Sequence, residues 1–237
     1  MTALPKQPLV VRPRDHRAED CLRPTRAEVD LSAIAHNLGV VRSLVPHGRV
    51  LAVIKADAYG HGVVPVARRL EDAGASAFGV ALAEEGLELR DAGIEAPILV
   101  LNGVSGGAHR ELVARKLRPV VYEAAEARAF SAAAVYVERQ VPIHLKIDTG
   151  MSRLGVPYGK LDAFLDLLDG LPRLRLEGVM THLASADGDD EVTAEQLDQF
   201  EAALARIRAR GHRPSVAHAA NSAATLRHPR AHYDLVR

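Results

Sequence analysis

The residues of this sequence that are best placed to take part in chemistry are lysines that lie in or directly after apolar segments. The chain has only five lysines against 25 arginines, and Lys55 directly follows Leu-Ala-Val-Ile. Lysine is rarely buried without a partner, and an amine in a partly desolvated site is suited to act as a nucleophile or to form a Schiff base. An ion pair between Lys55 and Asp57 is the structural alternative.

Lys146 and Asp148 lie two residues apart in the apolar segment 143–148, and Arg153 follows closely. Because side chains alternate along a strand, Lys146 and Asp148 are predicted to share one face. From spacing alone, a structural network of ion pairs is favoured over a catalytic role for these residues.

Three further polar positions follow or end apolar segments. His182 could be a general base, a ring-stacking partner or a core histidine, and the core role is favoured without context. His218 precedes Ala-Ala-Asn221-Ser222, where a helix is predicted to begin with a hydroxyl at its N-cap. The N-terminus of a helix can bind phosphate, although an ordinary serine cap explains the same residues.

Short apolar segments that alternate with helical patterns must position these residues. The apolar segments are 51–56, 77–81, 97–101, 118–122, 143–148, 176–182 and 216–221. Between these segments, apolar residues recur with the period of a helix, for example at Val63, Val66, Ala67 and Leu70. The segments are continuously apolar rather than alternating, as expected for parallel strands that are buried on both faces.

This order of strands and helices indicates either an open doubly wound sheet or a (β/α)8 barrel. The even spacing favours the barrel, and no Gly-x-Gly-x-x-Gly turn follows the first strand. An eighth strand is expected at 234–237. The predicted fold is therefore an α/β barrel that is incomplete at strand eight, with unpaired edges on strands one and seven. Its active site is expected at the carboxyl ends of the strands.

Composition excludes several other classes of function. Lys and Arg (30) balance Asp and Glu (30), which argues against a nucleic-acid partner. The single cysteine, Cys21, rules out an internal disulfide and a Cys/His zinc site, and no metal site is predicted. No apolar stretch approaches the ~20 residues of a membrane span, so we expect a cytoplasmic protein. Residues 1–25 are predicted to form a mobile arm before the domain 26–237.

Six segments together resemble alanine racemase, the enzyme that uses pyridoxal phosphate (PLP) to interconvert L- and D-alanine. They are 27–38, 53–62, 145–155, 181–187, 218–224 and 233–237, and they occur in the family's order. The run Lys-Ala-Asp-Ala-Tyr-Gly-His-Gly that begins at Lys55 is highly specific. The resemblance implies an isomerase that supplies D-alanine for peptidoglycan.

The resemblance also implies how the cofactor would be held. Lys55 would bind PLP covalently and exchange the α-proton on one face of the substrate. The cofactor phosphate would bind to Tyr59 and to the segment Asn221-Ser222, through the Ser222 hydroxyl and nearby backbone N–H groups. The pyridine ring would lie against His182.

Four more residues receive roles from the same resemblance. Arg237 would face the pyridine nitrogen, with His218 supporting it from behind. An arginine there disfavours protonation of that nitrogen, which favours simple proton exchange over side reactions. Arg153 would contact the phenolic oxygen of PLP and bind the substrate carboxylate. Lys146 corresponds to a lysine that is carbamylated in some members, and the resulting anion would orient Arg153.

Racemisation needs proton transfer on both faces of the α-carbon, and Lys55 serves one of them. In the family, a tyrosine from a C-terminal β-domain of a second subunit serves the other, so the resemblance implies a homodimer. We therefore expect this chain to be an incomplete or inactive part of a longer racemase. The alternatives are a natural truncation, a non-catalytic single-domain PLP-binding barrel, or another PLP barrel enzyme such as a serine or lysine racemase or an amino-acid decarboxylase.

Overall fold

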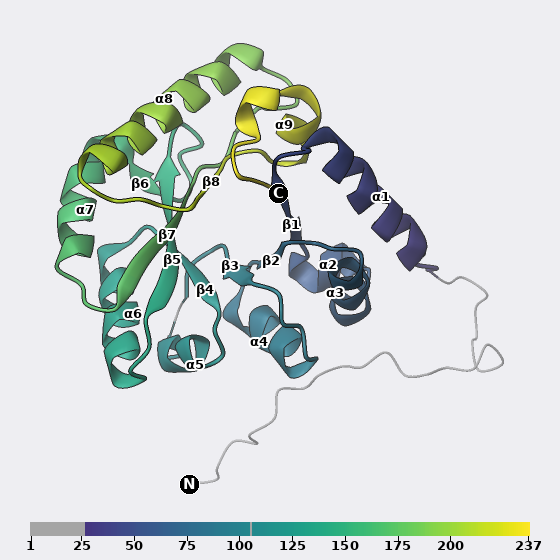
Figure 1. Ribbon diagram of the computed structural model, residues 1–237, viewed down its shortest axis with the longest axis horizontal. Helices are drawn as coiled ribbons and strands as arrows, with labels where there is room; N and C mark the ends of the chain where they lie inside the picture. Colours follow the sequence, from purple (N-terminus) through teal and green to yellow (C-terminus); the bar gives the residue numbers. More distant parts are fainter. Residues whose placement is uncertain (1–26, 105) are drawn as a thin grey trace, which may run out of the picture.

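The computed structural model describes residues 27–104 and 106–237 and shows eight parallel strands that curve into a barrel (Figure 1). The strands are β1 (Arg49–Val53), β2 (Ala77–Val80), β3 (Ile98–Val100), β4 (Arg118–Val121), β5 (Val141–Asp148), β7 (Leu174–Met180), β8 (Val216–His218) and β9 (Leu235–Val236). The first seven begin within two residues of the apolar segments, and the eighth falls at the predicted place.

The strands follow the order β8-β7-β5-β4-β3-β2-β1-β9, and each pair along it is parallel. The remaining gap, between β8 and β9, is crossed by backbone hydrogen bonds. The N–H of Asp234 donates to the carbonyl of Ala217 (3.1 Å), and the N–H of Arg237 donates to that of Ala220 (3.0 Å). The predicted (β/α)8 barrel is therefore confirmed.

The eighth strand is short, but the expectation of unpaired edges beside it is wrong. Leu235 and Val236 pair in parallel with Arg49 and Val50 of β1. Two extended residues are enough for this ladder because the segment that contains them is also hydrogen-bonded to β8 and to the residues just after it.

Helices surround the barrel. They are α1 (Leu31–Leu44), α2 (Lys55–Gly60), α3 (Val63–Asp72), α4 (Ala83–Asp91), α5 (His109–Ala114), α6 (Ala124–Tyr136), α7 (Leu161–Asp169), α8 (Asp190–Ala209) and α9 (Ser222–Arg227), with short 3-10 turns η2 (Tyr158–Lys160) and η3 (Pro229–Ala231). A two-residue strand, β6 (Val156–Pro157), pairs with β5. Figure 1 shows α1 and α3 to α8 as an outer ring. Within the described ranges, no helix is long and apolar enough to cross a membrane.

The strands separate two apolar clusters, which explains their continuously apolar sequences. The larger cluster lies between strands and helices and includes Phe78 and Leu145. The smaller one faces the barrel interior and includes Leu51, Leu99 and Met180. Polar residues share this interior, because on β5 the side chains that alternate with outward-facing Leu145 point inward.

The first helix begins at an aspartate cap. The carboxylate of Asp30 accepts hydrogen bonds from the N–H groups of Ser32 (2.8 Å) and Ala33 (3.1 Å), so Asp30 is the N-cap of α1. The expected arm, 1–25, lies outside the described residues, and so does Cys21.

Candidate active site

A cavity of about 590 Å³ opens at the carboxyl ends of the strands and continues between β1 and the helices beside it. Of the residues predicted for the site, those that line this cavity are Lys55, Tyr59, Lys146, Arg153, His182, Asn221, Ser222 and Arg237. The other one, His218, lies behind Arg237 and contacts it. The barrel therefore brings every predicted site residue to one place.

Lys55 is half-buried at the start of α2, just after β1 ends at Val53. The next four residues, 56–59, have left-handed backbone angles, with φ between 52° and 56°. This conformation costs roughly 1–2 kcal/mol for each residue other than glycine, so the rest of the structure must hold it in place. Nothing in the sequence predicts the hand of this turn.

Two carboxylates hold the left-handed turn. Glu85 accepts a hydrogen bond from the N–H of Ala56 (2.6 Å), and Asp57 accepts one from the N–H of Val63 (2.6 Å), at the start of α3. Asp57 is therefore not an ion-pair partner of Lys55, and Lys55 has no ion pair with any described residue. The role of Glu85 was not predicted, and the residue three positions before it is Leu82, so the sequence shows no capping-box signal there.

On β5, the expected ion-pair network around Lys146 does not form. The carboxylate of Asp148 instead accepts hydrogen bonds from the N–H groups of Gly150 and Ser152, both at 3.0 Å. These bonds close the loop that carries Arg153. Gly155 ends this loop with φ 134°, where a Cβ would lie 2.6 Å from the backbone nitrogen of Asp148, so only glycine fits.

Lys146 is buried at the cavity wall, and its environment disfavours its charge. Burial, followed by the nearby positive charges of Arg237 and Arg153, lowers the pKa of Lys146 to about 8, while Asp148 opposes this shift. About a tenth of this amine is therefore uncharged at pH 7, far more than for an ordinary lysine.

His182 lines the cavity just after β7 and is half-buried. Burial, followed by the charges of Arg237 and Lys146, lowers the pKa of His182 to about 4. The imidazole is therefore neutral at physiological pH. No described residue forms a hydrogen bond with its ring nitrogens, so the interpretation as a satisfied core histidine is not supported.

Arg237 is fixed by three hydrogen bonds. Its Nη1 donates to His218 Nδ1 (2.9 Å), and its Nη2 donates to the carbonyls of Thr181 (2.8 Å) and Ala219 (3.1 Å). Burial lowers the pKa of Arg237 to about 10, so the guanidinium stays charged. His218 is fully buried, and burial holds its pKa well below the usual value, so its ring is neutral and can accept.

At the start of α9, the cap differs from the prediction. Asn221, not Ser222, is the N-cap, and its Oδ1 accepts from the N–H of Ala224 at 2.9 Å. Ser222 becomes the first helical residue, because the amide of Asn221 reaches this N–H. The Ser222 hydroxyl therefore remains available to a ligand at the cavity wall, next to the free N–H groups of the first turn.

The cavity is strongly electropositive. Lys55, Lys146 and Arg153 have no ion-pair partner among the described residues, and Arg237 adds a fourth cationic group. The residues that line the cavity include no Asp or Glu among those described, and the carboxylate of Asp148, near Lys146, is hydrogen-bonded to backbone N–H groups. Such a site suits a ligand that carries several negative charges.

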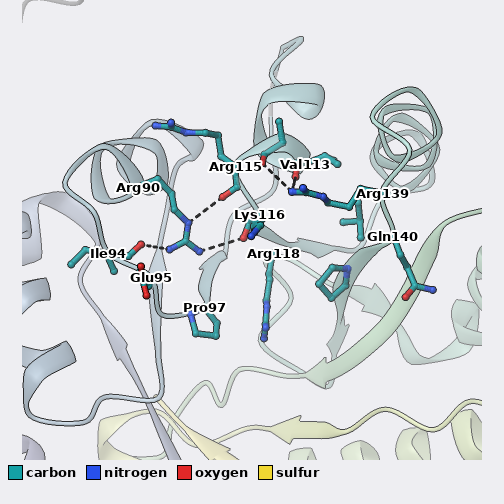
Figure 2. Close-up of a pocket in the computed structure, with 13 residues that line it drawn as sticks. Arg90, Ile94, Glu95, Pro97, Val113, Arg115, Lys116, Arg118, Arg139 and Gln140 are labelled. Carbon is teal, nitrogen blue, oxygen red and sulfur yellow. Dashed lines mark hydrogen bonds between the residues drawn. The ribbon is translucent and has the colours of Figure 1, made fainter.

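A second cavity, of about 700 Å³, lies at the opposite end of the barrel (Figure 2). It is also lined by arginines, but these have partners. Arg90 donates to the carbonyls of Ile94, Ala96, Arg115 and Lys116, and Arg139 donates to the carbonyl of Ala114 at 3.1 Å. Figure 2 shows Arg90 and Arg139 bonded to backbone carbonyls of the residues drawn, so we interpret this end as structural.

The chain is similar to known proteins over most of its length. The family model "Alanine racemase, N-terminal domain" matches residues 29–237. This chain belongs to that family. The alanine racemase of Geobacter sulfurreducens is 46% identical over 209 residues, which are 86% of this chain and 55% of that protein. That of Sorangium cellulosum is 47% identical over 224 residues, 91% of this chain and 59% of that protein.

Solved structures of the alanine racemase family share the fold. The enzyme from D-cycloserine-producing Streptomyces lavendulae gives a TM-score of 0.85 at 37% identity, covering 88% of this chain and 56% of that one. The alanine racemase of Clostridium difficile 630 gives 0.86 at 32% identity, covering 92% and 61%. The chain therefore spans little more than half the length of the racemases it matches, and the family predicted from the motifs is confirmed.

Proposed function

We propose that this chain is the PLP-binding barrel of an alanine racemase and that it takes part in interconverting L- and D-alanine. One observation carries this proposal. Lys55 lines a cavity together with Lys146 and Arg153, and none of the three has an ion-pair partner in the described ranges. In this proposal residues 26–237 form one domain after a separate arm at 1–25, and the product is D-alanine for peptidoglycan, made in the cytoplasm.

The residues present fit PLP in both charge and chemistry. When bound, PLP supplies an electron sink for the carbon that loses its proton. Lys55 offers the amine for covalent attachment, and Tyr59, Asn221 and Ser222 surround a place for a phosphate. Arg237 offers a fixed cation for the pyridine nitrogen.

The proton chemistry is assigned to Lys55 on one face of the substrate. Its amine has no ion-pair partner in the described residues, so it is free to take and return a proton. His182 is neutral and would pack against the cofactor ring without competing for protons. The other face requires an acid/base group that we expect from a second subunit, so the proposal includes a homodimer.

Arg153 would bind the substrate carboxylate, and Lys146 would orient it. The uncharged fraction of Lys146 is the form that reacts with carbon dioxide. A carbamate there would place an anion between the cations Arg153 and Arg237. Incubation with ¹³C-labelled bicarbonate should give a carbamate NMR signal that is lost in Lys146→Met and kept in Lys160→Met.

The central test of the proposal is covalent trapping. The chain is incubated with PLP, reduced with borohydride and digested, and the pyridoxyl group is located by mass spectrometry. We expect the label on the peptide that contains Lys55, and its loss in Lys55→Ala but not in Lys160→Ala, where an exposed lysine is removed. A label on Lys146 instead, or no label at all, would refute the assignment.

A further inference from the structure

A line of buried polar side chains crosses the barrel interior from the cavity to the opposite end. Arg237 Nη1 lies 2.9 Å from His218 Nδ1, and His218 Nε2 lies 2.8 Å from His144 Nδ1. His144 Nε2 then faces Glu177 Oε2 at 3.5 Å, and the same oxygen is 2.9 Å from Arg118 Nη1. Four strands, β8, β5, β7 and β4, and the end of the chain supply these residues.

Only one arrangement of protons satisfies this line when both rings are neutral. A guanidinium has no acceptor, so His218 Nδ1 must accept from Arg237 and His218 must carry its proton on Nε2. That proton points at His144 Nδ1, which must also accept. His144 therefore carries its proton on Nε2, facing the carboxylate of Glu177.

Both ends of the line keep this arrangement in place. Glu177 stays ionised, because the facing His144 and the cation of Arg118 hold the pKa of Glu177 down, at about 2. The two imidazoles are 1% and 0% exposed, so water does not offer them other partners. The two hydrogen bonds of the row, Arg237 to His218 and His218 to His144, polarise one another in the same direction, and the carboxylate of Glu177 faces the far nitrogen of His144.

The backbone also fixes the orientation of the middle ring. A Cβ at Gly178 of β7 would lie 2.2 Å from His144 Nδ1 and 2.4 Å from its Cε1. The imidazole therefore occupies the space that any other residue at 178 would fill. The ring of His144 meets that of His218 edge to face, with centroids 5.0 Å apart.

We infer that His144 and Glu177 are positioning residues, which act together with Arg237 to hold the proton of His218 on Nε2 and so keep a lone pair directed at Arg237. Arg237 is thereby held as a rigid donor at the cavity wall. The effect of this on PLP binding rests on the function proposed above. The direction of the protons in the row does not depend on that function.

The first test measures the protons directly in the chain without PLP. Long-range ¹H–¹⁵N NMR spectra of the histidine rings should show His218 and His144 with protonated Nε2 and unprotonated Nδ1. In His144→Leu the Nε2 proton of His218 is buried without an acceptor and Arg237 alone holds the tautomer, so a second tautomer should appear, with its proton on Nδ1 and no bond to Arg237. In His144→Gln an amide oxygen can still accept and its NH₂ can still donate to Glu177, so the single tautomer of His218 should be kept.

The second test measures PLP affinity by absorbance titration of the same proteins. We expect roughly tenfold weaker binding for His144→Leu and less than threefold weaker binding for His144→Gln, by analogy with the loss of supporting residues around bound ligands. Asp162→Asn, which breaks an Arg–Asp pair on the outside of the barrel, is the matched control. It should bind PLP as the original chain does.

The outcomes separate the two proposals. If the original chain binds no PLP, the proposed function fails, while the NMR spectra still decide the direction of the row. If His218 carries its proton on Nδ1, the inference is wrong. It is also wrong if His144→Leu matches the Asp162→Asn control in both tautomer and affinity. Should His144→Leu fail to fold, Glu177→Met takes its place, with Glu177→Gln as its conservative partner.

Discussion

The two ends of the barrel carry similar numbers of basic residues but use them in opposite ways. At the amino ends of the strands, Arg90 donates to four carbonyls and Arg118 is paired with Glu177. At the carboxyl ends, Lys55 and Arg153 have no ion-pair partner among the described residues. The two cavities therefore differ mainly in whether their basic side chains already have partners, and little in the number of these side chains or in cavity size. Within the described residues, only the end with unpaired basic side chains suits an anionic ligand.

Substitution of Arg90 should have the largest effect and tests the difference between the two ends most directly. We expect Arg90→Met to lower the free energy of unfolding by about 3 kcal/mol, since several carbonyls would lose their donor. Arg153→Met, at the other end, should leave stability nearly unchanged and weaken PLP binding. Urea unfolding and absorbance titration of both variants check this. Equal losses of stability would remove the distinction between the ends.

Gly178, between the two ends, should show the next largest effect. A methyl group there would collide with His144, so we expect Gly178→Ala to cost about 2 kcal/mol of stability in urea unfolding. Gly188→Ala is the matched control, because a Cβ at 188 meets nothing within 4 Å. If both substitutions are neutral, the imidazole is not locked in place as described.

Lys146 gives a smaller effect that depends on pH. Because its pKa is lowered from 10.5 to about 8, the unfolded chain binds more protons than the folded one between these values, and stability rises with pH across this window. Below pH 8 the buried charge costs free energy. Lys146→Met should therefore be more stable by about 1.5 kcal/mol at pH 7, with a smaller gain at pH 10.

This comparison should be made by urea unfolding in buffers free of carbon dioxide, without PLP. Lys160→Met, at an exposed position outside the cavity, should change little at either pH. A gain for Lys146→Met that is the same at pH 7 and pH 10 would show that packing, and not charge, is responsible.

The smallest effect is expected on the outside of the barrel. Asp162 pairs with Arg206, and both side chains are more than a third exposed (40% and 37%). Water and salt weaken such pairs, so Asp162→Asn should cost only about 0.5 kcal/mol and less in high salt. A loss as large as that of Arg90→Met would mean that exposed arginines also hold this fold together.

The barrel could be predicted from the sequence because its strands leave a strong local signal. A strand that is buried on both faces must be apolar at nearly every position, as in 51–54 and 97–101. The polar residues that interrupt or follow such runs could be placed at the carboxyl ends, and this placed Lys55 and His182 correctly.

The details that were missed depend on contacts that leave no local pattern. The spacing of Lys146 and Asp148 suggested an ion pair, but the backbone of the following loop takes up the carboxylate. The row from His144 to Glu177 joins strands that are distant in sequence, so no window contains it. The cap at Asn221 was missed because serine and asparagine are equally good caps.

The left-handed turn at 56–59 also bears on the order of folding. Chains of L-residues do not form such a turn unaided, and here it depends on Glu85, which also accepts from the N–H groups of Ala81 (2.7 Å) and Leu82 (3.0 Å). The first two strands and α4 must therefore assemble before Lys55 reaches its position. A chain in which these elements have not assembled would not present this amine correctly, so the position of Lys55 reports the assembly of this part of the barrel.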